Sequence, residues 1–297
     1  MEEEIKEISI EDENYPKLLK EINDAPKVLY YRGSLPRAES RGFAIVGARR
    51  CSAYGKQVAL EIAGNLTEAG LTIVSGLAPG IDTFAHTAVV ERRKKAIAVL
   101  GTGIDEESIY PKENIKLARK IIENGGCLIS EYSPGTPGSY FTFPRRNRII
   151  SGMSLGVLIV EAKEKSGALI TAEWARKQKR KVFAIPGSIY SLNSRGCHYL
   201  IKNGAKLVEN AYDILKELSS LKEINLPQIP RQAVLIGGNS QEENLILNTL
   251  KAEALFIDKI IEKTKLPASK VISLLANLEI RDKVRNLGGN IYAVSNR

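Results

Sequence analysis

Residues 139–181 read SYFTFPRRNRIISGMSLGVLIVEAKEKSGALITAEWARKQKRK, and this stretch contains the pattern that decides the fold. Its apolar run Val157–Val160 predicts a short buried strand. The pair Ser166 and Gly167 then opens a predicted helix. A strand, a loop and a helix in this order leave free backbone amides at the helix N-terminus, where the helix dipole favours an anion. We therefore expect a phosphate site at this junction, with Lys163 beside it.

The same alternation of apolar runs and helical intervals continues on both sides of this stretch, through residues 41–220. The runs are Ala44–Val46, Leu71–Val74, Ile97–Leu100, Cys127–Ser130, Val157–Val160, Val182–Ile185 and Lys206–Val208. Their spacing predicts an α/β fold built on a mostly parallel sheet. In an open sheet of this kind, ligands bind beyond the carboxyl ends of the strands. We therefore expect the loops after the strands to form one rim.

Glycine, serine and arginine follow the first three apolar runs. The candidate ligand contacts in these loops are Arg49, Arg50, Ser75, Gly76, Gly101, Thr102 and Gly103. No loop completes G-x-G-x-x-G or carries a Walker lysine, so no dinucleotide or nucleoside triphosphate cofactor is predicted. One glycine after a strand commonly serves a turn, whereas several such loops in register favour binding. Arg49 is either solvated or able to pair with a phosphate through both guanidinium nitrogens.

Positive charge is concentrated in residues 139–181, which contain ten Lys/Arg and three Glu, or +7 of the chain's net +9. Residues 1–40 contain six Lys/Arg and ten Asp/Glu, a net of −4. Within the basic stretch, the candidate nucleic-acid contacts are two rings and three cations, namely Phe141, Phe143, Arg145, Arg146 and Arg148. Cations hold phosphates and rings stack on bases, so single-stranded nucleic acid would use both. Alternation around Thr142 puts both rings on one face, which either stacks on bases or belongs to the core.

Composition excludes several other classes. Cys51, Cys127 and Cys197 form no C-x-x-C pair, which argues against a disulfide framework or a zinc site, so no metal is predicted. No apolar run approaches the length of a membrane span, and the acidic N-terminus is unlike a signal peptide, so we expect a cytoplasmic protein with no membrane partner. The pI near 9.3 favours polyanionic partners.

Three other titratable residues are weaker candidates. His86 lies four residues after Asp82 and could pair with it on a helix, but no third ligand or nucleophile accompanies them, so a structural role is favoured. Glu161 follows a strand and could act as a base, although an ion pair with a neighbouring arginine is the preferred interpretation. No catalytic residue is predicted.

Both ends of the chain differ from the centre. Residues 1–40 predict a helical lead-in, with an amphipathic helix near Tyr15–Ile22 and a strand at Val28–Tyr31. Residues 221–239 contain Pro and Gly without a helical period and predict a linker.

Residues 240–297 predict a small winged-helix domain. Three amphipathic helices are expected at Glu242–Lys251, Phe256–Lys263 and Ala268–Glu279. A hairpin around Gly288 and Gly289 is expected to join strands at Val284–Leu287 and Ile291–Val294. The third helix would read duplex DNA, yet its cations are only Lys270 and Arg281 at its ends. A protein-contact role is therefore at least as well supported as duplex recognition.

The order of the motifs resembles one known family. The chain contains GARR-x3-YG, SGLAPGID-x3-H, AVLGTGID, YPKEN, LISEY-x-PGTP, FPRRNRIISG, VEA-x3-SGALITA and FAIPGS-x5-SRGCH-x-LI between about Tyr15 and Val208. This succession resembles the DNA-processing protein A (DprA/Smf) family. The resemblance implies an extended Rossmann-like fold, a homodimer, single-stranded DNA binding without sequence preference, and loading of the RecA recombinase on incoming DNA in natural transformation.

Carried over by position, the family's G-S-R arginine falls on Arg49, and its basic F-P-R-R-N-R segment falls on residues 143–148. Two positions depart from the family pattern, because Ala48 replaces a serine and Pro79 replaces an arginine. These changes remove a hydroxyl and a charge, and so put affinity in question more than function. The helical module that opens many members is expected to be absent.

An enzymatic alternative comes from the lysine-decarboxylase-like phosphoribohydrolases, which have a related fold and a P-G-G-x-G-T-x-x-E loop. The matching place here reads SGALITAE, without the glycine pair and with Thr171 and Glu173 spaced differently. The binding protein is therefore the preferred hypothesis, and a nucleotide-processing enzyme is the alternative.

Overall fold

The computed structural model describes residues 4–35, 41–219, 240–281 and 283–295. The chain divides into two compact units, Met1–Ile229 and Pro230–Arg297. The predicted linker at 221–239 lies outside the described residues. Across the described ranges, every helix is too short or too polar to cross a lipid bilayer.

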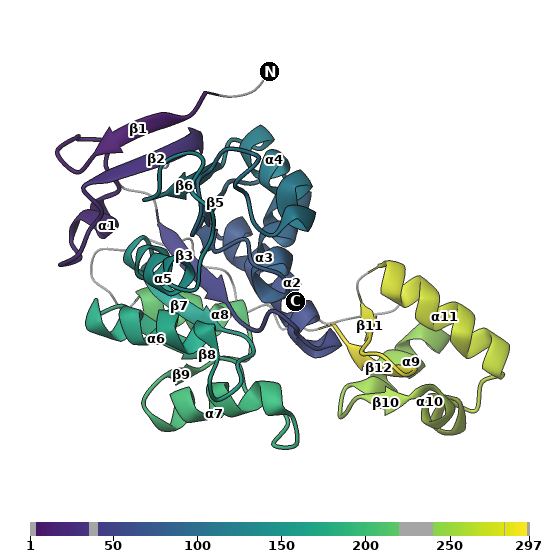
Figure 1. Cartoon of the computed structure of the whole chain (residues 1–297). Coiled ribbons are helices and arrows are strands. Elements are labelled where there is room, and N and C mark those ends of the chain that lie inside the picture. Colours follow the sequence, from purple (N-terminus) through teal and green to yellow (C-terminus); the bar gives the residue numbers. More distant parts are fainter. Residues whose placement is uncertain (1–3, 36–40, 220–239, 282, 296–297) are drawn as a thin grey trace. The chain divides into compact units, whose positions relative to one another are not determined.

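The first unit is built on a nine-stranded sheet with the order β1-β2-β6-β5-β4-β3-β7-β8-β9 (Figure 1). The strands are β1 Lys6–Ser9, β2 Val28–Gly33, β3 Gly42–Val46, β4 Thr72–Ser75, β5 Ala96–Val99, β6 Cys127–Ser130, β7 Gly156–Ile159, β8 Lys181–Ala184 and β9 Lys206–Leu207. In this order, every pair of neighbouring strands between β6 and β9 is parallel. At the other edge, β1 pairs with β2 and β2 with β6 in the antiparallel sense. The prediction of a mostly parallel Rossmann-like sheet is confirmed.

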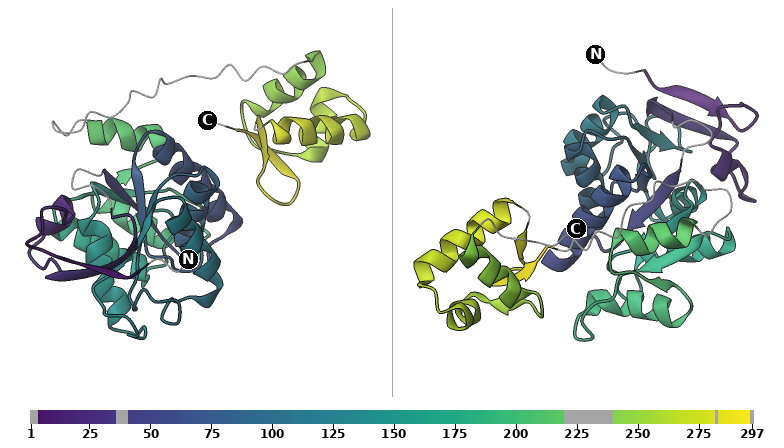
Figure 2. Two further views of the ribbon diagram at one scale, coloured as in Figure 1. Left: turned by 90° about the horizontal axis from the view of Figure 1, so that it is seen from above. Right: turned by 180° about the vertical axis from the view of Figure 1, so that it is seen from behind.

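Helices cover both faces of this sheet (Figures 1 and 2). One layer contains α2 Ala53–Glu68, α3 Ile81–Glu91, α4 Ile115–Glu123 and α8 Ala211–Ser219, and the other contains α1 Lys17–Lys20, α5 Thr142–Gly152, α6 Gly167–Lys177 and α7 Arg195–Lys202. Alternation along β3 serves both layers, because Phe43 and Ile45 pack with the first and Ala44 and Val46 with the second. Burial on both faces explains why this strand has no polar position.

The expectation of a mainly helical N-terminal segment is wrong. The predicted helix is reduced to the single turn α1, and β1 and β2 instead extend the sheet by pairing along β6. The apolar positions were still recognised correctly, since Tyr15, Leu19 and Ile22 are buried. They pack with the α5 layer, and the Tyr15 hydroxyl donates to the Pro26 carbonyl at 2.7 Å. Tertiary packing therefore explains the pattern without a long helix.

The basic segment before β7 also differs from its prediction, because α5 replaces the extended run in which two rings share a face. A reciprocal cap starts this helix, since the Ser139 amide donates to Thr142 Oγ1 at 2.8 Å and the Thr142 amide donates to Ser139 Oγ at 3.2 Å. Pro144 is tolerated because it lies in the first turn. The rings consequently separate, with Phe141 85% exposed and Phe143 half-buried.

The second unit is a winged-helix domain, as predicted. Its elements are α9 Gln241–Leu250, β10 Leu255–Phe256, α10 Ile257–Thr264, α11 Ala268–Ile280, β11 Val284–Asn286 and β12 Ile291–Val294. The strands form an antiparallel sheet of order β10-β12-β11, and β11 and β12 make the hairpin around Gly288 and Gly289. A separate core contains Ile246, Ile260 and Leu275. The prediction missed β10, whose two residues are too few to show an alternating pattern.

Candidate nucleic-acid interface

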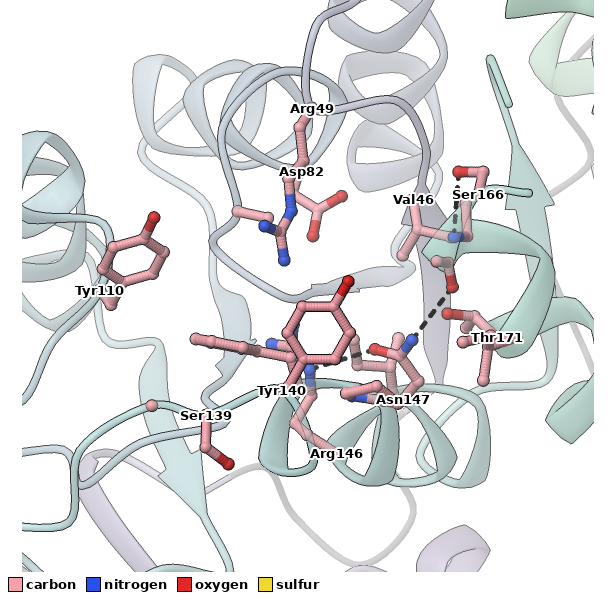
Figure 3. Close-up of a pocket in the computed structure, with 18 of the residues that line it drawn as sticks. Val46, Arg49, Asp82, Tyr110, Ser139, Tyr140, Arg146, Asn147, Ser166 and Thr171 are labelled. Atoms are coloured by element: carbon pink, nitrogen blue, oxygen red, sulfur yellow. Dashed lines mark hydrogen bonds between the residues drawn. The ribbon is translucent and has the colours of Figure 1, made fainter. Parts of the chain in front are cut away.

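The strand order creates a crevice between β3 and β7. β3 pairs with β4 on one side and with β7 on the other, and Val46 lies opposite Ile159 near the carboxyl ends. The loops that follow these two strands consequently diverge, which is the topological switch point where open α/β sheets bind ligands. A pocket of about 1190 Å³ opens at this point (Figure 3).

Five exposed cations line the pocket, namely Lys112 and four that are supplied by the two loops that diverge there. The loop after β3 contributes Arg49 and Arg50, and the loop after β7 contributes Lys163 and Lys165. Within the described ranges none of the four forms a salt bridge. Their charge is therefore available to an anionic ligand.

The backbone around Arg49 is fixed by a close approach to the start of α3. The Ile81 amide donates to the Ala48 carbonyl at 3.2 Å. Gly80 makes this possible, because it has φ +81° and a Cβ there would collide with the carbonyl of Ala48. The Arg49 guanidinium then lies over the ring of Phe143, with its carbon 5.6 Å from the ring centre. Figure 3 shows Arg49 pointing from its loop toward the middle of the pocket.

The N-terminus of α6 forms the opposite wall. Ser166 caps this helix by accepting from the Ala168 amide at 3.3 Å, and Asn147 of α5 donates to the Gly167 carbonyl at 3.1 Å (Figure 3). Ser166 and Gly167 line the pocket beside the two lysines. A helix N-terminus next to cations is a favourable place for a phosphate.

Two buried charged residues, Arg146 and Asp82, form the floor of the pocket. Arg146 is 4% exposed and donates to the carbonyls of Gly76, at 2.8 Å, and Val99, while Asp82 accepts from the Gly76 amide at 3.0 Å. Burial lowers the pKa of Arg146 to about 10, opposed by the charge of Asp82. Burial likewise raises the pKa of Asp82, opposed by Arg146. Arg146 is thus a fixed charge beneath the site and has little freedom to follow a ligand.

The structure brings together about half of the residues predicted from the sequence. Those that line the pocket are Arg49, Arg50, Phe143, Arg146, Lys163, Ser166 and Gly167. Those that do not are Ser75, Gly76, Gly101, Thr102, Gly103, Phe141, Arg145 and Arg148.

The loops after β4 and β5 are excluded because other segments cover them. Ser75 and Thr102 are buried, and their hydroxyls donate to the carbonyls of Ile45 and Gly103 at 2.6 and 2.8 Å. The Gly103 amide donates to Thr136, and Phe143 of α5 packs directly on Gly101. These loops, including Gly76, support α5 and offer no open phosphate socket.

Arg148 is a structural residue. Its side chain is 5% exposed, its two terminal nitrogens each lie 2.8 Å from a carboxylate oxygen of Glu131, and its Nε lies 3.0 Å from Asp24. Arg145 also approaches Glu131, at 3.6 Å, but its side chain is 66% exposed. The expected phosphate contact of Arg148 is therefore replaced by an internal ion pair.

The far end of the basic stretch is likewise used in packing. Arg176 donates to the Asn203 carbonyl at 2.8 Å, Arg180 to the Leu18 carbonyl at 2.8 Å, and Lys181 to Glu217 at 2.7 Å. Much of the net charge of this stretch consequently does not face the pocket.

Glu161 has different partners from those expected. Its carboxylate is 3% exposed and accepts from the Ser52 amide at 2.9 Å, the Ser52 hydroxyl at 2.6 Å and Asn193 Nδ2 at 3.3 Å. The predicted ion pair with an arginine is wrong. Sequence reasoning also missed Asn193, for which no motif gave a signal, and Tyr140, an exposed ring that directly precedes the basic segment.

His86 is structural, as the sequence favoured. It is completely buried on α3, and burial lowers its pKa to about 4, so the ring is neutral at physiological pH. In the described parts of the chain, no three His, Cys, Asp or Glu residues gather as a metal site would require, and the three cysteines are free.

Comparison with known proteins places this fold and pocket in context. Residues 6–219 match the family model described as DNA recombination-mediator protein A, and residues 231–290 match the DprA winged helix domain. The chain is 49% identical over 209 residues to DNA processing protein DprA of Streptococcus pneumoniae, covering 70% of this chain and 73% of that protein. It is 39% identical over 277 residues to protein Smf of Escherichia coli, covering 92% and 73% respectively.

Solved structures agree with these relatives. DNA processing protein A of Helicobacter pylori, whose structure concerns its single-stranded DNA binding mode, superposes with a TM-score of 0.65 at 30% identity, covering 74% of this chain and 99% of that one. The matched region contains the nine-stranded sheet and the pocket at its switch point. The chain therefore belongs to the DNA recombination-mediator protein A family.

Proposed function

We propose that this protein binds single-stranded DNA without sequence preference in the pocket between β3 and β7. The observation that carries this proposal is the Arg49 guanidinium lying over the Phe143 ring, beside the α6 N-terminus and beside Lys163 and Lys165, which form no salt bridge among the described residues. The Helicobacter pylori relative, known for its single-stranded DNA binding mode, supports the same conclusion.

The chemistry of the pocket favours single strands over duplexes. Arg49, Arg50, Lys163 and Lys165 would hold phosphates, and the rings of Phe143 and the neighbouring tyrosines would stack on bases. A duplex hides the faces of its bases, so only an unpaired strand can use both kinds of contact. Phosphate contacts and stacking also carry little information about base identity, which is why we propose binding without sequence preference.

We propose a binding role rather than catalysis. Two of the three acidic residues that line the pocket are engaged in the fold, since Asp82 accepts from the Gly76 amide and Asp105 accepts from the Gly135 amide at 2.7 Å, whereas the third, Glu107, is exposed. Glu173, the carboxylate of the alternative enzyme loop, is exposed and outside the pocket lining. Incubation with nucleoside monophosphates should release no free base, and base release would favour the enzymatic alternative.

Salt-dependent fluorescence anisotropy with a labelled poly-dT strand tests the proposal. Neutralisation of four phosphates by Arg49, Arg50, Lys163 and Lys165 predicts a log K against log salt slope of roughly −2.8, from about −0.7 per phosphate of a single strand. A slope near zero, or equal affinity for a duplex of the same length, would contradict the proposal.

We further propose, from the family resemblance, that the protein loads RecA on incoming DNA in natural transformation and that it acts in the cytoplasm. We propose RecA as a protein partner on this basis. The readout is the lag before RecA hydrolyses ATP on a single strand, which this protein should shorten. An unchanged lag would limit the role to DNA binding.

We also propose a homodimer, formed through the edge of the sheet at β9. Ile189, Tyr190, Leu192, Tyr199 and Leu207 are large apolar side chains exposed around this edge strand, and Tyr190 is 91% exposed. Clusters of this kind mark interaction surfaces, and an unpaired edge strand can pair with a second copy. Sedimentation velocity should show a dimer that Tyr190→Asp or Leu207→Asp dissociates without lowering the melting temperature.

For the winged-helix domain we propose a protein contact. Lys270 lies 3.1 Å from Glu242, and Arg281 pairs with Glu243, so α9 neutralises both the cation within α11 and the one that directly follows it. The exposed face of α11 instead presents Ile272 and Ile280, the latter 82% exposed. A helix that reads duplex DNA needs donors and cations on this face.

A further inference from the structure

We propose that Glu161 is a positioning residue, which holds the loop carrying Arg49 in the geometry that binds phosphate. This inference rests on the proposed single-stranded DNA function and assigns to it a residue that touches no ligand itself. Glu161 is a buried carboxylate at the end of β7, on the opposite side of the crevice from the Arg49 loop.

Both oxygens of the Glu161 carboxylate accept hydrogen bonds from the loop after β3, on the other side of the crevice. Oε2 accepts from the Ser52 amide at 2.9 Å and from Asn193 Nδ2 at 3.3 Å, while Oε1 accepts from the Ser52 hydroxyl at 2.6 Å. Gly55 leaves the space for it, because a Cβ there would lie 2.5 Å from Oε2. Hydrogen bonds to an ionised acceptor are stronger than neutral ones. The loop after β3 is thereby attached to β7.

Asn193 forms a second connection between the loops after β3 and β7. Its Nδ2 also donates to the Arg50 carbonyl at 3.1 Å, and its own carbonyl accepts from the Ala162 amide at 2.7 Å. Asn193 lies in the short 3₁₀ helix Leu192–Ser194, so a third segment joins the two loops. One partly buried network therefore fixes both Arg50 and the residue after Glu161.

Arg49 lies between the two attachments. On its N-terminal side, the Ala48 carbonyl accepts from Ile81, and on its C-terminal side Arg50 and Ser52 are held by Asn193 and Glu161. The Arg49 side chain itself is exposed. Its direction over Phe143 consequently depends on a backbone that Glu161 secures.

Removing the Glu161 carboxylate should change DNA affinity in opposite directions, depending on whether its charge or its hydrogen bonds matter more. A carboxylate near a phosphate site repels DNA, so removing its charge should tighten binding if charge is all that matters. If Glu161 positions Arg49, removing its hydrogen bonds should weaken binding despite the favourable charge change. Glu161→Gln and Glu161→Ala remove the same charge, but only glutamine can still accept from the Ser52 amide and contact its hydroxyl.

The experiment measures salt-dependent anisotropy with poly-dT for the full-length parent and both variants. Glu161→Gln should bind as tightly as the parent or more tightly. Glu161→Ala should bind about tenfold more weakly than Glu161→Gln, or 1.4 kcal/mol, with a salt slope shallower by about 0.7. Glu164→Ala is the matched control, because Glu164 is exposed in the same loop and pairs only with Arg195, at 3.4 Å, among the described contacts. It should not weaken binding. Equal binding by the Gln and Ala variants at every salt concentration would overturn the proposal.

A double-mutant cycle separates positioning from general loss of structure. In an Arg49→Ala background, the difference between the Gln and Ala variants should disappear, because no guanidinium remains to be positioned. A difference that persists would mean that Glu161 acts through some other residue and would overturn the inference. Asn193→Ala provides a second route should Glu161→Ala fail to fold, and it should weaken binding in the parent but not in the Arg49→Ala background.

Amide hydrogen exchange at Ser52 distinguishes this inference from the proposed function. Exchange should be faster in Glu161→Ala than in Glu161→Gln without any DNA present, because only the alanine variant leaves the Ser52 amide without its acceptor. If Arg49→Ala binds DNA like the parent, the proposed phosphate site is wrong, and the Ser52 exchange rates alone decide whether Glu161 holds the loop. Equal exchange rates in the two variants would overturn the attachment itself.

Discussion

The guanidinium carbon of Arg49 lies 5.6 Å from the centre of the Phe143 ring, and the same ring lies 5.7 Å from that of Tyr110. These residues follow β3, begin α5 and follow β5, respectively. They meet because the first turns of α5 lie at the carboxyl ends of β4 and β5, where Arg146 donates to the carbonyls of Gly76 and Val99. The proposed phosphate contact and the proposed stacking ring are thus adjacent, and single-strand binding combines these two kinds of contact.

The first prediction concerns Arg49. Arg49→Ala should weaken binding to poly-dT and to a mixed sequence by the same factor, because phosphates carry no base information. The salt slope should flatten by about 0.7, since one phosphate contact is lost. Salt-dependent anisotropy measures both effects. Lys120→Ala, an exposed cation near the end of α4 and outside the pocket, is the control and should change neither.

How far the site could be predicted depended on the distance in sequence between each residue and its partners. Arg49 was identified because it directly follows a buried strand, and that placement is local. The burial of Arg148 could not be foreseen, because Glu131 and Asp24, which neutralise it, lie in distant segments. The sheet itself was predictable from its apolar runs, since strands buried on both faces leave a continuous signal.

Other predictions failed because of close local contacts that the sequence pattern does not show. The rings of Phe141 and Phe143 were assigned to one face, but the Ser139–Thr142 cap begins a helix there and turns them apart. Glycines 76, 101 and 103 looked like sockets because glycine after a strand signals close approach. The approach is real, but in two of the three the neighbour is a side chain of α5, Arg146 at Gly76 and Phe143 at Gly101, with no ligand involved.

The second prediction separates stacking from packing at Phe143. The ring is half-buried and packs on Gly101 and Gly138, so Phe143→Ala should lower the melting temperature as well as the affinity. Loss of base stacking should cost about 1–3 kcal/mol of binding free energy with the salt slope unchanged. Phe143→Tyr keeps the ring and should retain affinity. A variant that melts early but binds normally when folded would assign the ring to the core alone.

The third prediction compares two arginines on the same carboxylate. Arg148→Ala leaves Glu131 buried without its bidentate partner and should reduce the free energy of unfolding by about 3–5 kcal/mol. Arg145→Ala removes an exposed contact at 3.6 Å and should cost about 1 kcal/mol or less. Urea denaturation measures both values. Similar stability of the two variants would contradict the structural role of Arg148.

The fourth prediction is a pH dependence of stability from His86. The pKa of this buried ring is about 4 in the folded protein and 6.5 in the unfolded chain, so the unfolded state binds more protons between these values. Stability should therefore fall as pH drops from 6.5 toward 4, by at most about 3 kcal/mol from this residue. His86→Leu should remove that part of the decrease. Asp82 has its pKa raised and acts in the opposite sense, so the comparison is made between parent and variant at each pH.

The last prediction tests whether the winged-helix domain contributes to single-stranded DNA binding. Removal of residues 240–297 should leave single-stranded DNA affinity within about tenfold of the parent, or 1.4 kcal/mol, because all the pocket residues lie in the first unit, which has its own cores. The salt slope should also be unchanged, since Lys270 and Arg281 are already neutralised by α9. Anisotropy on the truncated and full-length proteins measures both quantities. A larger loss of affinity together with a flatter slope would place phosphate contacts in the winged-helix domain, and would replace the protein-contact proposal for α11 with a second DNA surface.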